Sequence, residues 1–121
     1  MIQATELRLG NWIRRNERNV FHYAKVSIYT IARSEYEDFE FIKPIPLTPE
    51  ILEKAGFVWN ENINHWVIEW GKNGVHFIKD EPFYKGYGFQ LGKAHYKIIH
   101  TLHQLQNLYF ALTGEELEIN L

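Results

Sequence analysis

The residue types that suggest a chemical function in this 121-residue chain are lysines interleaved with aromatic rings. They gather between residues 83 and 97, a stretch without any acidic residue. Single-stranded nucleic acids bind such stretches because bases stack on the rings while cations contact the phosphates. The candidate residues for nucleic-acid binding are Lys85, Tyr87, Phe89, Lys93 and Lys97. The alternative interpretation is a glycine-rich hairpin with solvated lysines.

Residues 85–89 match the first five positions of the RNP1 pattern of RNA-recognition domains. The match then ends, because Gln90 replaces an aliphatic residue and Gly92 stands where an aromatic residue belongs. A formal net charge of −2 and the acidic run at residues 35–40 also disfavour a nucleic-acid partner. Nucleic-acid binding is therefore the alternative function.

Other reactive side chains lack the neighbours that catalysis or metal binding requires. His95, His100 and His103 lie close in sequence, but no carboxylate accompanies them. The chain has no cysteine, and neither Ser27 nor Ser34 lies in a nucleophile elbow. The sequence therefore predicts no catalytic residue, no metal and no cofactor. We expect a protein that is not an enzyme, with a small hydrolase as the third hypothesis.

A long helix is predicted near residues 101–113, where Thr101 and Gln104 fit a capping box and leucines recur at helical spacing. Its amide-rich face is a candidate surface for a partner protein, with capping and solvated surface as the alternative interpretation. The candidate partner-binding residues are Gln104, Gln106, Asn107, Tyr109 and Phe110.

The rest of the pattern predicts an α+β fold. Thr48, Pro49 and Gly56 delimit a short helix near residues 48–55. We expect an antiparallel, twisted sheet or partly open small barrel, covered by this helix and by the longer C-terminal one. One domain spans residues 1–121 in this prediction. Residues 1–46 supply the N-terminal strands, with an SH3-like barrel as one option, and residues 47–121 supply a helix, hairpins, the long helix and a terminal strand.

Composition agrees with one globular domain, since 45% of the residues are hydrophobic and 16% are aromatic. The N-terminus lacks the apolar core of a signal peptide, and no stretch is apolar enough to span a membrane. We therefore expect a cytoplasmic protein without a membrane partner. An unknown protein partner is favoured over nucleic acid, and homo-oligomerisation stays open.

Three stretches, at residues 6–12 (ELRLGNW), 44–57 (PIPLTPEILEKAGF) and 103–117 (HQLQNLYFALTGEEL), carry the most specific motifs. In this order and spacing they resemble a family of small uncharacterised proteins of gut-bacterial genomes and their prophages. The resemblance implies a shared scaffold and a mobile-element origin, and it transfers no catalytic residue. The favoured function is a non-enzymatic accessory or protein-interaction module that binds another protein through exposed aromatic residues.

Overall fold

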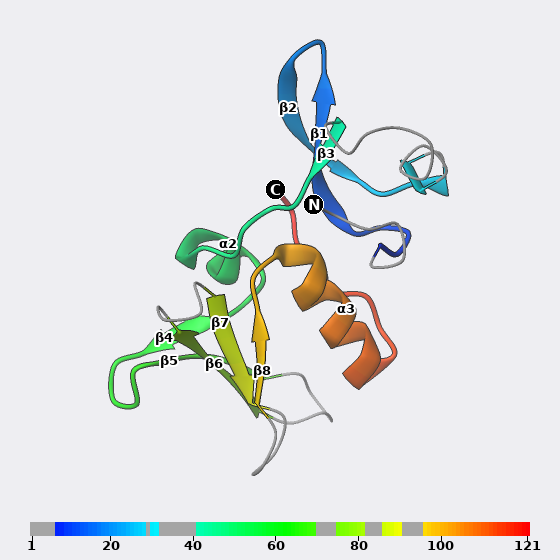
Figure 1. The fold of residues 1–121 in the computed structure, drawn as a ribbon. Helices are drawn as coiled ribbons and strands as arrows, with labels where there is room; N and C mark the ends of the chain where they lie inside the picture. The colour runs from blue at the N-terminus through cyan, green and yellow to red at the C-terminus, as the bar shows by residue number, and fades with distance from the viewer. Residues whose placement is uncertain (1–6, 29, 32–40, 70–74, 82–85, 91–95) are drawn as a thin grey trace. The chain divides into compact units, whose positions relative to one another are not determined.

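The computed structural model describes residues 7–28, 30–31, 41–69, 75–81, 86–90 and 96–121. They fall into two compact units (Figure 1). Unit 1 comprises Met1–Pro46 and Thr101–Leu108, and unit 2 comprises Leu47–His100 and Tyr109–Leu121. Two antiparallel sheets and two helices make up the described elements, so the predicted α+β class is confirmed. No helix in this part of the chain is long and apolar enough to cross a membrane.

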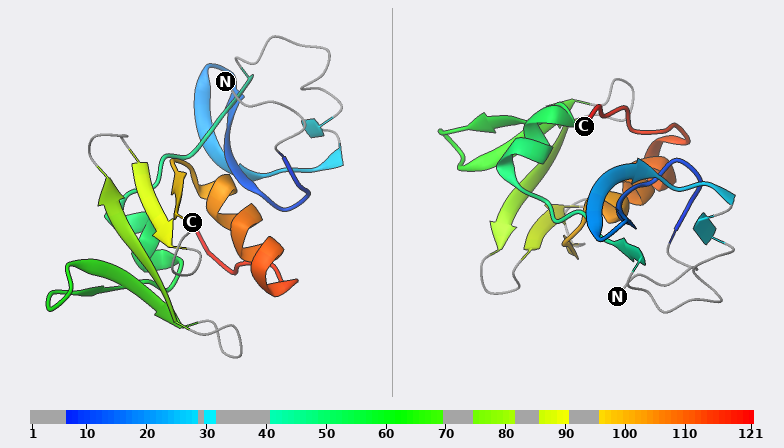
Figure 2. Two further views of the ribbon diagram at one scale, coloured as in Figure 1. Left: turned by 60° about the horizontal axis from the view of Figure 1, so that its bottom comes forward. Right: turned by 90° about the horizontal axis from the view of Figure 1, so that it is seen from above.

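Unit 1 contains a three-stranded sheet in the order β2-β1-β3. Its strands are β1 (Trp12–Glu17), β2 (Val20–Lys25) and β3 (Ile42–Lys43), and β1 pairs antiparallel with both neighbours. The first two form a strongly curved hairpin (Figure 2). Arg18 and Asn19 close it with φ of 54° and 67°, as a two-residue turn requires to match the strand twist. In the residues described, this sheet does not close into an SH3-like barrel.

One face of this sheet supplies the core of unit 1. Ile13 and Ile42 are almost fully buried, and they cluster with Leu7, Val26 and Phe41. Gly10, with φ of 87°, lies in a turn directly before β1. Its backbone N–H donates to Val26 O at 2.9 Å, so the turn and the end of β2 are joined.

Unit 2 contains a five-stranded antiparallel sheet in the order β4-β5-β6-β7-β8. The strands are β4 (Val58–Asn60), β5 (His65–Glu69), β6 (Val75–Glu81), β7 (Gly86–Gln90) and β8 (Tyr96–Ile99). The register aligns Trp66 with Ile78 and Ile78 with Phe89, so these side chains share the buried face. No strand is predicted from the sequence at residues 96–99, where the structure has β8.

The short helix α2 (Pro49–Lys54) confirms the prediction made from its capping residues. The Thr48 hydroxyl accepts the Ile51 N–H at 3.2 Å, and Pro49 occupies the first turn. Gly56 follows with φ of 100°, a conformation that favours glycine and reverses the chain into β4. Ile51 and Leu52 are the buried residues of α2.

The long helix α3 (Leu102–Thr113) likewise matches its prediction and ends before Gly114, whose φ is 75°. After it, the predicted terminal strand is wrong: residues 116–121 form no strand. Leu117 and Ile119 are nevertheless buried, while Glu116, Glu118 and Asn120 are exposed. Residues 116–121 therefore show the alternating burial of a strand without forming one.

Gly86, at the start of β7, has no room for a side chain. A Cβ there would lie 2.6 Å from His100 Nδ1 and 2.8 Å from Ile99 O. Because the Ile99 carbonyl belongs to the backbone, it cannot move aside without disturbing the β7–β8 pairing. Gly86→Ala should lower the free energy of unfolding by about 1–3 kcal/mol, measured by urea denaturation. His100→Ala should restore only part of the loss, and an unchanged G86A midpoint would contradict the packing described.

Candidate functional site

The structure places the aromatic residues of the predicted nucleic-acid segment inside unit 2. Phe89 is 0% exposed and Tyr87 is buried beside it on the same sheet face. Burial, with smaller effects from the carboxylates of Asp80 and Glu50, raises the pKa of the Tyr87 phenol. Buried rings offer no open face for a base. Lys97 is exposed, whereas Lys85 and Lys93 lie outside the described residues.

The RNP1-like spacing has a structural cause in β7. Residues of a strand alternate between the two faces of the sheet, so Tyr87 and Phe89 both enter the core. Gly88 lies between them, and Gly86, which precedes Tyr87, is required by the close approach of β8. The pattern that resembles an RNA-binding strand is, in this sheet, the pattern of a tightly packed core strand.

The predicted partner surface on α3 consists partly of side chains that bond within unit 1. Gln104 and Thr101 form the predicted capping box: Thr101 N–H donates to Gln104 Oε1 at 3.2 Å, and Gln104 N–H donates to Thr101 Oγ1 at 3.3 Å. Gln106 is 2% exposed, and its Oε1 accepts the Trp12 N–H at 2.7 Å. For Gln104, the alternative interpretation of the amide-rich face as helix capping is therefore correct.

Asn107 joins the same helix to the N-terminal turn. Its Oδ1 accepts Asn11 Nδ2 at 2.9 Å and Arg8 Nη1 at 3.0 Å. Asn11 is 0% exposed, and its Oδ1 accepts the Arg8 N–H at 2.7 Å. Together these bonds hold the turn before β1 against the first part of α3.

Tyr109 and Phe110 belong to the part of α3 that lies in unit 2. Tyr109 is partly buried and Phe110 is exposed. The three amide side chains bond inside unit 1, and Phe110 is the exposed aromatic residue among the five candidates. Binding of a partner on α3 stays a prediction.

The remaining candidate side chains do not assemble into a reactive site in the described ranges. His103 is buried, His100 is exposed, and His95 lies outside the description. No group of three or more histidines and carboxylates among the residues described could hold a metal ion. The Ser27 hydroxyl lies 3.2 Å from the Thr30 hydroxyl, and the pair caps a local turn. Ser34 is not described.

Among the described residues of unit 2, the most exposed large apolar side chains belong to the hairpin formed by β4 and β5. Val58, Trp59 and Ile63 are all exposed, and Trp59 exposes 42% of its surface. The Trp59 ring meets Trp66 edge to face, with centroids 5.5 Å apart and an angle of 63°. An exposed indole is thus fixed in position by a buried one directly across the strands.

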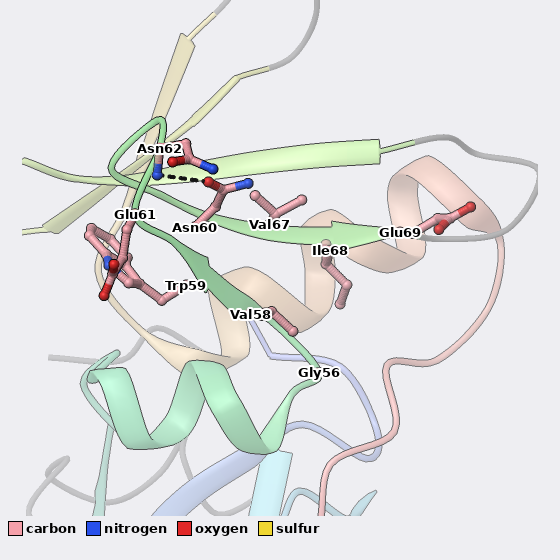
Figure 3. A pocket seen from close by; sticks show the side chains of 9 residues that line it. All are labelled: Gly56, Val58, Trp59, Asn60, Glu61, Asn62, Val67, Ile68 and Glu69. Atoms are coloured by element: carbon pink, nitrogen blue, oxygen red, sulfur yellow. Dashed lines mark hydrogen bonds between the residues drawn. The ribbon is translucent and has the colours of Figure 1, made fainter.

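A shallow depression of about 750 Å³ follows this hairpin (Figure 3). Its lining includes Val58, Trp59 and Ile68 together with the polar turn that joins the strands. That turn is ordered by the Asn62 N–H, which donates to Asn60 Oδ1 at 3.0 Å, and by Asn64 with φ of 54°. The depression therefore has an apolar floor and a defined polar end.

Both ionisable residues that line the depression are acidic. Glu61 lies in the turn and Glu69 ends β5, so the carboxylates mark opposite ends of the depression, as Figure 3 shows. Residues 56–69 contain no lysine or arginine. The local field thus favours a cationic group.

The sequence predicts hairpins within residues 47–121, but it does not show that this one exposes an apolar surface. The available signal was a polar turn at residues 60–64 with a tryptophan close to each end, at Trp59 and Trp66. Which of two such rings is exposed depends on the neighbours of each strand. Trp66 lies between β4 and β6, whereas Trp59 lies on a strand at the sheet edge.

Comparison with known proteins gives no relative: no protein-family model, curated protein or solved structure matches this chain significantly.

Proposed function

We propose that this chain is a non-enzymatic interaction module that binds an extended, basic segment of a partner protein on the β4–β5 hairpin. The observation that carries the proposal is the exposed indole of Trp59, which Trp66 holds edge to face on this hairpin. Ordered aromatic side chains supply much of the binding energy at protein interfaces because they bury a large area with few rotamers to lose.

The position of β4 supports an extended ligand. It is an edge strand of the five-stranded sheet, and a strand edge presents N–H and C=O groups that another segment can pair with. Since β4 has only three residues, backbone pairing there is short. Side-chain contacts with Trp59 and the depression would therefore have to supply most of the affinity and all of the specificity.

The acidic residues that line the depression favour a basic segment of the partner protein. Glu61 and Glu69 attract lysine or arginine at the two ends of the depression, and no basic residue in 56–69 competes for them. A cation can also lie against the exposed indole of Trp59. The resemblance of residues 6–12, 44–57 and 103–117 further supports an origin in mobile elements, where a small binding module would act as an accessory protein.

A displayed library of random peptides, selected on the full chain, tests this proposal. We expect peptides that alternate apolar residues with lysine or arginine. Trp59→Ala should weaken their binding by about 2 kcal/mol, or roughly 30-fold in Kd, in a direct titration. Glu61→Gln and Glu69→Gln should weaken binding more at low salt than at high salt, because screening already reduces the contribution of exposed charges.

Val20→Ala is the matched control, since Val20 is an exposed apolar strand residue of unit 1. Its binding should equal that of the unmodified chain. Selected peptides that bind W59A with undiminished affinity, or a selection that enriches no basic peptide, would contradict the proposal. Circular dichroism of each variant separates a lost contact from a lost fold.

A further inference from the structure

One face of the β2-β1-β3 sheet combines three aromatic rings with three cations. Residues directly opposite in an antiparallel pair share a face, and the register pairs Trp12 with Lys25, Arg14 with Tyr23, and Arg14 with Lys43. Phe21 lies two residues before Tyr23 and therefore on the same side. We call this surface the cationic sheet face; it consists of Trp12, Arg14, Phe21, Tyr23, Lys25 and Lys43.

Contacts between these side chains confirm that they share the face. Lys25 Nζ lies 5.4 Å from the centroid of the Trp12 ring, and Lys43 Nζ lies 4.9 Å from that of Phe21. Tyr23 is 51% exposed, so its ring is accessible from solvent. Rings and positive charges are therefore interleaved at contact distance.

No carboxylate from the three strands opposes this charge. The one acid in them, Glu17, alternates to the other side of the sheet, where it forms an ion pair with Arg15. Arg14 is anchored, because its Nε donates to Pro44 O at 3.0 Å, and this bond uses one of the five N–H donors of the guanidinium. The three described strands thus contribute only positive charge to this face, although the chain as a whole carries a formal charge of −2.

We propose that the cationic sheet face binds single-stranded nucleic acid. Arg14, Lys25 and Lys43 contact phosphates, and the Tyr23 ring stacks on a base, with Phe21 and Trp12 beside it. A single strand fits better than a duplex because stacking on side chains needs bases whose flat faces are not already covered. This site is separate from the predicted segment at residues 83–97, whose described aromatic residues are buried in unit 2.

Fluorescence anisotropy with short labelled single-stranded DNA and RNA, titrated with the full chain, tests the proposal. Three neutralised phosphates predict a slope of about −2 for log K against log salt, or a loss of about 20-fold from 50 to 200 mM salt. The triple variant R14Q/K25Q/K43Q should abolish most of the binding. Tyr23→Ala should weaken it by about tenfold, whereas Tyr23→Phe should keep it, because the ring remains.

Two matched control variants test whether binding is specific to the cationic sheet face. Val20→Ala changes an exposed residue on the opposite face of the same hairpin, and Lys97→Gln removes the exposed lysine of the 83–97 segment. Both should bind as the unmodified chain does. The proposal fails if no binding occurs at low salt, or if K97Q weakens binding and the triple variant does not. It also fails if two results occur together: Y23A binds as tightly as the unmodified chain, and heparin or duplex DNA competes as effectively as single-stranded nucleic acid. These results would show that the face attracts any polyanion.

Discussion

Replacing Phe89 with alanine should lower the free energy of unfolding by about 3–5 kcal/mol. The ring is 0% exposed and lies on the buried sheet face, in register between Ile78 of β6 and Lys97 of β8. Its removal loses the transfer free energy of a whole ring and leaves a cavity that a paired sheet cannot close. Since small domains are stable by about 5–15 kcal/mol, the variant should be close to unfolding at 37 °C.

Urea denaturation followed by far-ultraviolet circular dichroism measures this change. Phe89→Leu, which keeps an apolar side chain, should lose less than half as much stability. An F89A variant that unfolds at the same urea concentration as the unmodified chain, yet binds single-stranded nucleic acid more weakly, would instead support the interpretation of residues 83–97 as a binding segment. The experiment therefore decides between a core strand and a stacking strand.

Features fixed by neighbours in sequence could be predicted. The Thr48 cap and the Thr101 capping box both form from residues three positions apart, and both appear as expected. Hairpin turns are only partly local: the polar run at residues 14–19 favours a hairpin tip, but its first four residues belong to β1, and only Arg18 and Asn19 form the two-residue turn with positive φ. Local signals therefore predict both described helices.

Features that depend on distant parts of the chain could not be predicted. Tyr87 and Phe89 have the same spacing in a stacking strand and in a core strand, and only the strands on either side decide which one forms. Leu117 and Ile119 alternate with polar residues as a strand would, but they form no strand. The cationic sheet face could not be predicted from the sequence, because its three cations come from three separate strands.

Long-range hydrogen bonds also connect two of the three stretches that the sequence analysis singled out. The stretch at residues 6–12 and the stretch at 103–117 lie almost at opposite ends of the chain. In the structure they bond to each other through Asn11 to Asn107 and Trp12 to Gln106. These two stretches are therefore joined by hydrogen bonds in unit 1, and we call the contact of Asn11 and Trp12 with Gln106 and Asn107 the hydrogen-bonded joint.

Replacing Asn11 with alanine should break that joint and cost about 2–3 kcal/mol of stability. Asn11 is 0% exposed, and its amide both accepts the Arg8 N–H and donates to Asn107. Alanine would remove the Asn11 acceptor of the Arg8 N–H in a partly buried turn. An unsatisfied buried donor destabilises the fold by more than one satisfied hydrogen bond stabilises it. Amide hydrogen exchange gives a reading specific to unit 1, because the protection of Arg8 N–H should fall in N11A.

A double-mutant cycle with Asn107→Ala isolates the side-chain pair. If the two amides act together, the double variant should lose less than the sum of the single losses, with a coupling energy of about 0.5–3 kcal/mol. Asn120→Ala, at an exposed position, should change stability by less than about 0.5 kcal/mol. Strictly additive losses, or unchanged protection of Arg8 in N11A, would contradict the joint. Coupling without any change in nucleic-acid or peptide binding would show that these motifs hold unit 1 together, whereas the ligands contact other residues.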